Sequence, residues 1–205
     1  DHNAFSYYAV TEAEINGLAC YISRSGWTGE RGFEIYSKDD DFNGEALWQY
    51  LLCEGAPFQL MASDVTSMHI RRLEAGILDY GTDIDQSLNP FELGLGQFVD
   101  LSKDDFIGQR ALLETDRRAT RVMGLRSHEV RPIRGDCLMN EAGDSLGAIT
   151  AGAWSPSLDC GIGIIRLDRP IDPDVALRLR TETGNFQAEL CPLPFYDPQK
   201  RIPRL

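Results

Sequence analysis

The pattern of hydrophobic and polar positions in the first third of the chain predicts two short β-strands and two helices. Strand-like runs rich in Ile, Tyr and Phe occur at 18–25 and 32–37, and three glycines in the connection between them allow a sharp turn. Apolar residues then recur at helical spacing over 41–53, which predicts an amphipathic helix. A second helix is expected to begin near Ser63, whose hydroxyl can cap it, and to end at Gly76.

The middle of the chain carries signals for short elements only. Residues 89–92 read Asn-Pro-Phe-Glu, which places a capping residue, a first-turn proline and a back-bonding glutamate in the order that opens a helix. A strand is expected at 97–101 and a short helix at 109–117. The pair Arg117-Arg118 is interpreted as the boundary of a structural unit.

The last part of the chain contains short β-like runs and no helical periodicity. Turn sequences at 140–143 and 182–185 separate some of these runs. This spacing predicts a small β-barrel or sandwich, followed by an irregular strap over 192–205. The runs are Thr120–Ser127, Ser145–Thr150, Gly161–Leu167, Val175–Thr181 and Phe186–Cys191.

Composition and charge narrow the possible functions. The 205 residues are 42% hydrophobic and 25% charged, as in a soluble globular protein, and no apolar run is long enough to span a bilayer. The formal net charge of −12 lies in residues 1–100, which hold 5 Lys and Arg against 17 Asp and Glu. Such a chain repels a phosphate backbone, so it is not expected to bind nucleic acid, and the asymmetry suggests two units. The chain begins with Asp1 rather than Met, so we expect a fragment.

Common metal and cofactor motifs are missing from the sequence. The five cysteines form no C-x-x-C pair and the three histidines have no partner at ligand spacing, so we expect no metal site, no disulfide scaffold and a reducing, cytoplasmic location. The acidic run 39–41 is interpreted as the cap of the following helix rather than as a metal site. Dinucleotide, phosphate-loop and hydrolase motifs are also absent.

One cluster of residues offers binding chemistry. Glu34 and Tyr36 are two positions apart in a predicted strand, so their side chains share one face, while Phe33 and Ile35 are expected to face the core. Trp27 lies in the preceding glycine-rich connection. The carboxylate can accept paired N–H groups, and the aromatic rings can stack on a flat heterocycle or attract a cation. The alternative is a solvated strand face without a ligand.

Four sequence blocks, in the same order as in that family, resemble the aminomethyltransferase family, the T-protein of the glycine cleavage system. The first reads S-R-S-G-W-T-G-E-R-G-F-E-I-Y and the second R-L-E-A-G-I-L-D-Y-G-T-D-I-D. The blocks are Ser23–Tyr36, Arg72–Asp85, Asn89–Leu95 with Asp105–Leu112, and Gly147–Leu158 with Gly161–Gly163.

The resemblance implies an α+β fold and a tetrahydrofolate-dependent one-carbon transferase. Residues 1–118 would form the C-terminal part of the folate-binding T-protein body, a mixed sheet with helices, and 119–205 a small antiparallel β-barrel. Glu34 would hold the pterin ring, with Tyr36 and Trp27 lining the pocket and Arg201 reaching the glutamyl carboxylates of the folate tail. No catalytic residue is assigned, because the family uses an Asp from its N-terminal half, so this chain alone is expected to be incomplete as a catalyst.

The one-carbon donor stays open at this stage. The combination of Trp27, Glu34 and Tyr36 resembles dimethylsulfoniopropionate demethylases, which transfer a methyl group from a sulfonium to tetrahydrofolate. The second block resembles aminomethyltransferases equally well, and these work on a lipoyl carrier protein. The expected partners are therefore a small-molecule one-carbon donor or a lipoyl carrier. A family arginine that binds folate aligns with Met68, and Arg71 is its possible substitute. The alternative is a non-catalytic folate-binding or scaffold module.

Overall fold

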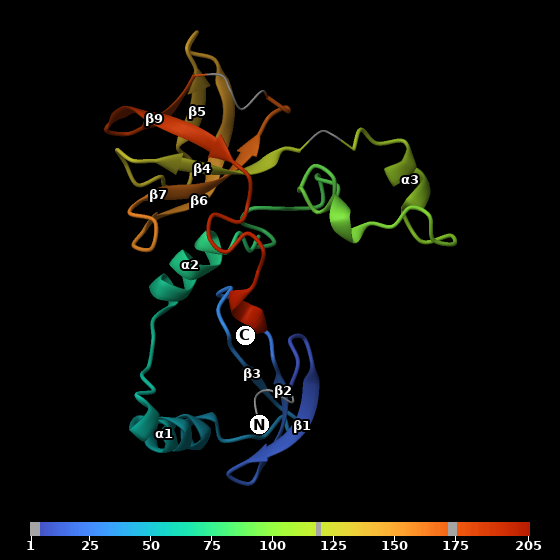
Figure 1. Ribbon diagram of the computed structural model, residues 1–205, viewed down its shortest axis with the longest axis vertical. Coiled ribbons are helices and arrows are strands. Elements are labelled where there is room, and N and C mark those ends of the chain that lie inside the picture. Colours follow the sequence, from blue (N-terminus) through green and yellow to red (C-terminus); the bar gives the residue numbers. More distant parts are fainter. Residues whose placement is uncertain (1–4, 118–119, 172–175) are drawn as a thin grey trace. The chain divides into compact units, whose positions relative to one another are not determined.

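The fold is of the predicted α+β class. The computed structural model in Figure 1 describes residues 5–117, 120–171 and 176–205. It contains a three-stranded sheet, a few short helices and a closed barrel. The chain divides into two compact units, the first made of 1–71 with 199–205 and the second of 72–198.

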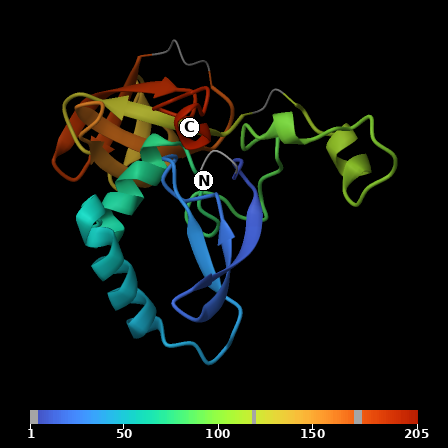
Figure 2. The same ribbon diagram turned by 60° about the horizontal axis from the view of Figure 1, so that its bottom comes forward.

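The sheet of the first unit is antiparallel, with the order β1-β2-β3 (Figure 2). Its strands are β1 (Val10–Ile15), β2 (Leu18–Ser23) and β3 (Glu34–Ser37). The two strands predicted in this region are confirmed, whereas β1 was not predicted. β1 and β2 form a hairpin through Asn16 and Gly17, both of which have positive φ angles, 48° and 79°. An Asn-Gly pair adopts these angles readily and fits the twist of a hairpin.

The first helix, α1 (Gly44–Gly55), begins later than the apolar pattern indicated. Its N-cap is Asn43, whose side-chain oxygen accepts a hydrogen bond from the Ala46 N–H at 3.0 Å. The expectation that the acidic run 39–41 caps this helix is therefore wrong, because Asn43 stands at the position from which a side chain reaches the free N–H groups. A short 3₁₀ helix, η2 (Ala56–Phe58), follows α1.

The second helix, α2 (Val65–Glu74), contains residues 71 and 72, between which the chain divides into its two units. Its first turn is capped by Asp64, whose carboxylate accepts the Ser67 N–H at 2.7 Å. The capping role predicted for Ser63 is wrong, because the Ser63 hydroxyl instead forms a side-chain hydrogen bond with the Ser67 hydroxyl at 2.6 Å. The helix ends before Gly76, which has a φ angle of 63°, as predicted for a glycine terminator.

The capping signal at 89–92 is real, but the helix that it predicted does not form. The Asn89 side chain accepts the N–H of Glu92 at 3.1 Å, and Glu92 bonds back to the Asn89 N–H at 3.0 Å. Gly94 then takes a φ of 71°, which ends the turn after a few residues. The strand predicted at 97–101 is also wrong, since η3 (Gly96–Phe98) is a 3₁₀ helix and the rest is irregular.

Beyond η3, the predicted helix at 109–117 is present in shortened form as α3 (Gln109–Leu113). Arg117 is described, but Arg118, the other half of the expected unit boundary, lies outside the described residues. The last short helix is η4 (Ile202–Arg204), within the segment predicted as an irregular strap.

The second unit contains a closed antiparallel barrel, which confirms the barrel prediction against the sandwich (Figure 1). The strand order is β4-β7-β6-β5-β8-β9. Of the predicted runs, Val175 lies outside the described residues, and one strand, β5, was not predicted. The strands are β4 (Val122–Ser127), β5 (Cys137–Asn140), β6 (Ser145–Ser155), β7 (Cys160–Leu167), β8 (Leu177–Thr181) and β9 (Gly184–Cys191).

The barrel interior is filled by aliphatic side chains from its own strands. Alternate residues of a strand point inward, as Ile165 and Leu167 of β7 and Leu177 and Leu179 of β8 do. This interior is the main hydrophobic core of the described chain, and it gives the second unit its own source of stability. Its buried members are Leu125, Leu138, Leu146, Ile149, Ile165, Leu167, Leu177, Leu179 and Ala188.

Cys191, at the end of β9, is expected to be chemically inert in the folded protein. Burial, as the largest cause, raises the pKa of its thiol from 9.0 to about 11. At pH 8 its thiolate fraction is then about 100-fold lower than that of an ordinary thiol, so alkylation by iodoacetamide is expected to be slower by a similar factor. Mass-spectrometric mapping of alkylated peptides measures this, with exposed Cys53 as the internal control. Equal labelling of the two residues before urea is added would contradict the prediction.

The raised pKa of Cys191 also links stability to pH. The unfolded chain loses this proton first, so the contribution of the buried thiol to stability is complete below pH 9.0 and is lost as pH rises towards 11.

Within the described residues, no helix has the length and apolar composition needed to cross a membrane.

Candidate functional site

Glu34, the first residue of β3, is held by a chain of hydroxyl groups from β2 and the residues after it. The Ser25 hydroxyl donates a short hydrogen bond to Oε2 of Glu34, and the hydroxyls of Ser25 and Ser23 lie 2.7 Å apart. Antiparallel pairing puts Ser23 directly opposite Glu34, which explains why these side chains meet on one face of the sheet. The carboxylate is therefore oriented rather than free to rotate in solvent.

Tyr36 lies on the same face as Glu34, two residues further along β3. A side-chain hydrogen bond with Glu34 is the main cause that raises the pKa of the Tyr36 phenol above its usual value. The phenol therefore stays protonated at neutral pH. Tyr36 is 52% exposed, so part of its side chain is accessible to a ligand. The register agrees with the expectation that these two side chains share one face of the sheet.

The chemistry of this pair fits a planar group with two adjacent N–H donors. A carboxylate has about four lone-pair positions, and two hydroxyl donors leave acceptor capacity for two further N–H groups. Two parallel N–H bonds to one carboxylate are stronger and more directional than a single bond. The residues present therefore suit the amino-pyrimidine edge of a pterin such as tetrahydrofolate.

Trp27 lies in the loop between β2 and β3 and is 39% exposed. Among the described residues, the structure records no ring contact or hydrogen bond between Trp27 and either Glu34 or Tyr36. The loop itself is tied to other segments of the first unit: Glu30 forms an ion pair with Arg71 on α2, and Arg31 donates to the Leu205 carbonyl at 3.4 Å. These contacts fix the loop that carries Trp27.

The remaining candidates occupy different surroundings. Arg201 is an exposed residue at the N-cap position of η4, and its backbone carbonyl accepts the Arg204 N–H at 3.1 Å. Met68, which the resemblance aligns with the family arginine, is 39% exposed. Arg71, the expected substitute for that arginine, forms an ion pair with Glu30 of the glycine-rich loop.

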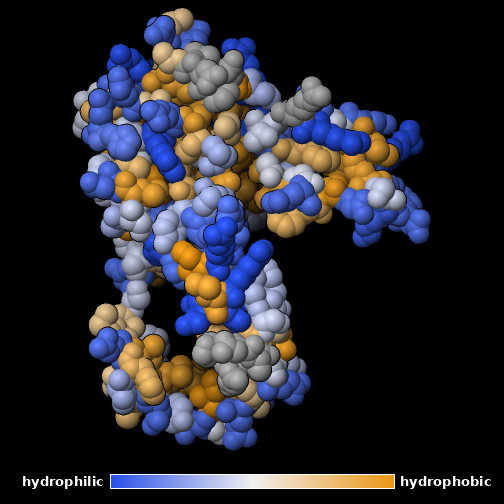
Figure 3. Space-filling model, in the orientation of Figure 1, coloured by the Kyte–Doolittle hydropathy of each residue, from blue (hydrophilic) through white to orange (hydrophobic). Residues whose placement is uncertain are grey.

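The expectation that Phe33 and Ile35 belong to a core is wrong for the described chain. The register confirms that Ile35 lies on the face opposite to Glu34 and Tyr36, but Phe33 is 48% and Ile35 37% exposed. Among the described hydrophobic residues of 5–71, only Cys20 is buried. The physical reason is that a three-stranded sheet buries a face only when another layer packs on it. Figure 3 shows hydrophobic residues, coloured orange, at the surface in the lower part of the molecule.

Sequence reasoning did not find Ser23 and Ser25 as parts of the site. The signal was available, because both lie within the S-R-S sequence that opens the first block and both follow the strand alternation. A hydroxyl two residues from another, on a strand next to Glu34, is well placed to orient a carboxylate.

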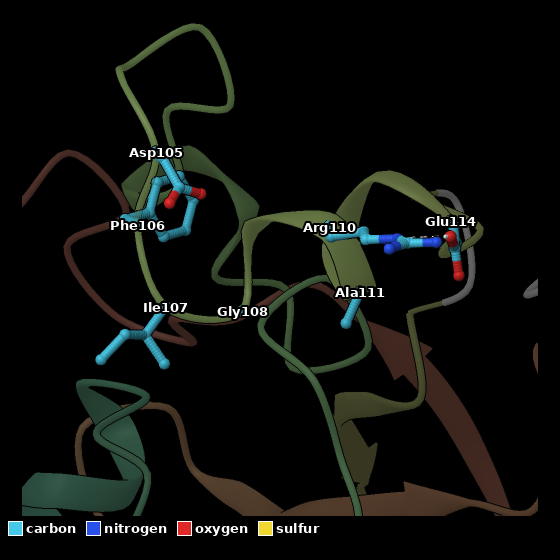
Figure 4. A pocket seen from close by; sticks show the side chains of 7 residues that line it. All are labelled: Asp105, Phe106, Ile107, Gly108, Arg110, Ala111 and Glu114. Atoms are coloured by element: carbon cyan, nitrogen blue, oxygen red, sulfur yellow. Dashed lines mark ion pairs between the residues drawn. The ribbon is translucent and has the colours of Figure 1, made fainter.

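A surface hollow elsewhere in the chain has no comparable chemistry. It has a volume of about 690 Å³ and is lined by Asp105, Phe106, Ile107, Gly108, Arg110, Ala111 and Glu114 (Figure 4). Its walls come from the single segment 105–114, Ile107 is fully exposed, and Arg110 pairs with Glu114. Within the described part of the chain, no group of His, Cys, Asp and Glu side chains is arranged to hold a metal ion.

Comparison with known families agrees with this geometry. The model of the GCVT N-terminal domain matches residues 1–103, and the model of the glycine cleavage T-protein C-terminal barrel domain matches residues 120–197. The chain belongs to the glycine cleavage T-protein family. The predicted resemblance is therefore confirmed at the level of the family, and both Glu34 and the barrel lie within matched regions.

Curated relatives and a solved structure give the same result. The aminomethyltransferases of Saccharopolyspora erythraea and Streptomyces avermitilis are 33% and 34% identical and match 96% and 98% of this chain. The crystal structure of glycine cleavage system aminomethyltransferase T from Bartonella henselae has a TM-score of 0.79 at 25% identity and matches 95% of this chain. The chain covers 54%, 55% and 54% of these proteins, so it spans about half the length of its relatives.

Proposed function

We propose that this chain is the tetrahydrofolate-binding C-terminal part of an aminomethyltransferase and that Glu34 anchors the pterin ring. The observation that carries the proposal is the oriented carboxylate of Glu34, held by Ser25 and paired with Tyr36 on an accessible sheet face. The names of the curated relatives support the aminomethyl reaction. The domain boundary is proposed near 118, between the two matched regions.

The residues of this chain bind and orient rather than perform chemistry. Bound tetrahydrofolate supplies the nitrogen that accepts the one-carbon unit. Glu34 accepts two N–H bonds from the pterin edge, Ser25 keeps the carboxylate in position, and Tyr36 and Trp27 offer aromatic surface on which the ring can stack. Arg201 is proposed to neutralise the glutamyl carboxylates of the tail, because it is an exposed residue whose planar guanidinium matches the geometry of a carboxylate.

The proposed partners follow from the aminomethyl reaction. An aminomethyl group is carried on a lipoyl arm, so the whole protein is proposed to dock a lipoyl carrier protein. A protein of this kind, without a disulfide scaffold in its sequence, is proposed to act in a reducing compartment such as the cytoplasm.

Replacing Glu34 by Gln is expected to weaken tetrahydrofolate binding by about 1–3 kcal/mol, or roughly 5- to 150-fold in Kd. The amide removes the charge and one acceptor, while the shape of the side chain is kept. Anaerobic titration calorimetry on the complete gene product measures the change. Glu12→Gln is the matched control, because Glu12 lies on the same sheet face but pairs with Lys38 at 3.0 Å. An unchanged affinity for Glu34→Gln would remove this residue from the site.

The nature of the donor is decided by a product assay. The complete protein is offered an aminomethyl-lipoyl carrier in one reaction and dimethylsulfoniopropionate in another, each with tetrahydrofolate. We expect methylenetetrahydrofolate from the carrier. Methyltetrahydrofolate from the sulfonium alone would favour the demethylase, whose aromatic cluster and carboxylate suit a cation. Tight folate binding without either product would favour a non-catalytic module.

A further inference from the structure

The three-stranded sheet has two chemically different faces. The site face carries polar and phenolic side chains, including Glu12, Tyr21, Glu34 and Tyr36. We refer to the opposite side as the apolar face, because the antiparallel register groups aliphatic side chains there. Its apolar members are Ala13, Ile15, Leu18, Cys20, Ile22 and Ile35, and Thr11 and Ser37 lie on the same face.

The apolar face is not fully covered by the described residues. Ile35 is 37% exposed, and Phe33, which leads into β3, is 48% exposed. Phe33 stacks on Phe5, with ring centroids 6.1 Å apart, so an aromatic pair extends the apolar surface at this end of the sheet. A contiguous apolar surface of this kind usually marks a site where another layer of protein packs.

Arg24 lies at the same end of the sheet and on the same side. It stands between Ser23 and Ser25, whose hydroxyls meet on the site face, so alternation directs the Arg24 side chain to the apolar face. Its side chain is only 4% exposed. Nη1 donates to the Phe5 carbonyl at 2.6 Å, but Nε and Nη2 are buried and have no hydrogen-bond partner among the described residues.

The two unpartnered nitrogens of Arg24 identify the missing group. Nε and Nη2 lie on one edge of the guanidinium and form the fork that accepts both oxygens of a carboxylate side-on. A buried cation with two unused donors is strongly unfavourable, because it has lost hydration without gaining hydrogen bonds. Although residues 1–100 contain 17 acidic residues, no described carboxylate is paired with Arg24.

We propose that Arg24 receives an Asp or Glu carboxylate from a segment of the same gene product that lies outside these 205 residues and covers the apolar face. A polypeptide segment can supply both an apolar layer and an acid, which a small anion cannot. The relatives carry about twice the length of this chain on one polypeptide, so a covering segment of that kind has a source. A ligand at Glu34 lies on the other face, so this inference does not depend on folate binding.

The test compares labelling of the two faces in the complete gene product. Ile35→Cys introduces a thiol on the apolar face, and Tyr21→Cys introduces one on the site face at a position that is similarly exposed here, at 40%. With N-ethylmaleimide and peptide mapping, we expect the thiol at position 35 to react at least about tenfold more slowly than that at position 21. Equal rates would overturn the proposal. Adding Arg24→Lys, which keeps the charge but not the fork, is expected to raise the rate at position 35.

A crystal structure of the same complete protein tests the ion pair directly. We expect two oxygens of one Asp or Glu from outside these residues within about 3.2 Å of Nε and Nη2. A different partner for these nitrogens, or solvent, would overturn the assignment. If protection at position 35 disappears on dilution and light scattering shows a dimer, a second copy of the chain covers the face, and the proposed occupant is wrong.

Discussion

Replacing Arg72 by Met is expected to lower the free energy of unfolding of the second unit by about 3–5 kcal/mol. Arg72, at the end of α2, and Asp83 form an ion pair at 2.6 Å, with side chains only 3% and 0% exposed. Asp83 also accepts the Asp79 N–H at 2.9 Å and the Thr150 hydroxyl at 2.6 Å. Without the guanidinium, a charged carboxylate stays buried with its main counter-ion missing. Urea unfolding followed by circular dichroism measures the loss.

The matched control uses an exposed ion pair of the same unit. Arg166 and Asp85 approach to 2.8 Å, but their side chains are 30% and 50% exposed. Arg166→Met is expected to have a much smaller effect, because water replaces the lost partner of Asp85. The double variant Arg72→Met with Asp83→Asn should cost less than the two single changes added together, since no unpaired charge remains. Equal losses for Arg72→Met and Arg166→Met would contradict a special role for the buried pair.

One hydrogen bond of Asp83 depends on a feature that sequence periodicity does not predict, which is the position of a bulge in a strand. The contact of Asp83 with Thr150 depends on an irregularity between Ile149 and Ala151 in β6, where the register with β7 shifts. An extra residue at such a bulge re-aims the side chains near it. The sequence 147–155 contains the right residues for a strand, but it does not state where the alternation is broken.

The sequence contains a signal for the hairpin at the start of the chain, but the pattern of apolar residues does not reveal it. β1 holds two Glu and one Thr among its six residues and is mostly exposed, so it lacks the apolar alternation that predicts the other strands. The pair Asn16-Gly17 was the stronger signal, because few residues adopt two successive positive φ angles. Local turn chemistry therefore predicts this strand better than hydrophobicity does.

Helix signals predicted one cap correctly, at Asn89 and Glu92, but they placed the caps of α1 and α2 on the wrong residues and overestimated helix length. The capping box at Asn89 and Glu92 forms as expected, but Gly94 ends the turn at once. A cap satisfies only the first free N–H groups, while a helix persists through propagation and the packing of an apolar face. The same reasoning explains why the helix predicted over 109–117 is shorter than its sequence pattern.

The sequence predicts that Glu34 and Tyr36 lie together in the candidate site, but it does not predict the residues that orient them. Glu34 and Tyr36 follow from strand alternation alone, which is a local property of the backbone. The orienting role of Ser25 depends on the register between β2 and β3, and the exposure of Ile35 depends on whether another layer is present. Both are tertiary properties, so residue spacing within one strand does not reveal them.

Gly161→Ala is expected to destabilise the barrel by about 3 kcal/mol, at the upper end of the cost of overpacking. Gly161 lies in β7, where the segment before β5 crosses close above it. A Cβ atom at this position would collide with the Val130 carbonyl oxygen and approach the Pro132 ring to 2.7 Å. The first of these atoms belongs to the backbone, so a rotamer change cannot relieve the clash. Thermal unfolding followed by circular dichroism measures the effect.

Gly163 provides a control in the same strand, because the space above it is less tight. A Cβ there would lie 3.1 Å from the end of the Ile149 side chain and 3.3 Å from the Ala151 carbonyl oxygen. Ile149 can shift by a small change of rotamer, so Gly163→Ala is expected to cost about 1 kcal/mol. The costs of the two alanine substitutions would then differ because the atoms packed above the two glycines differ, and not because of strand propensity. If both alanines cost the same, the close approach of the segment at Val130 to β7 does not limit the packing of the barrel.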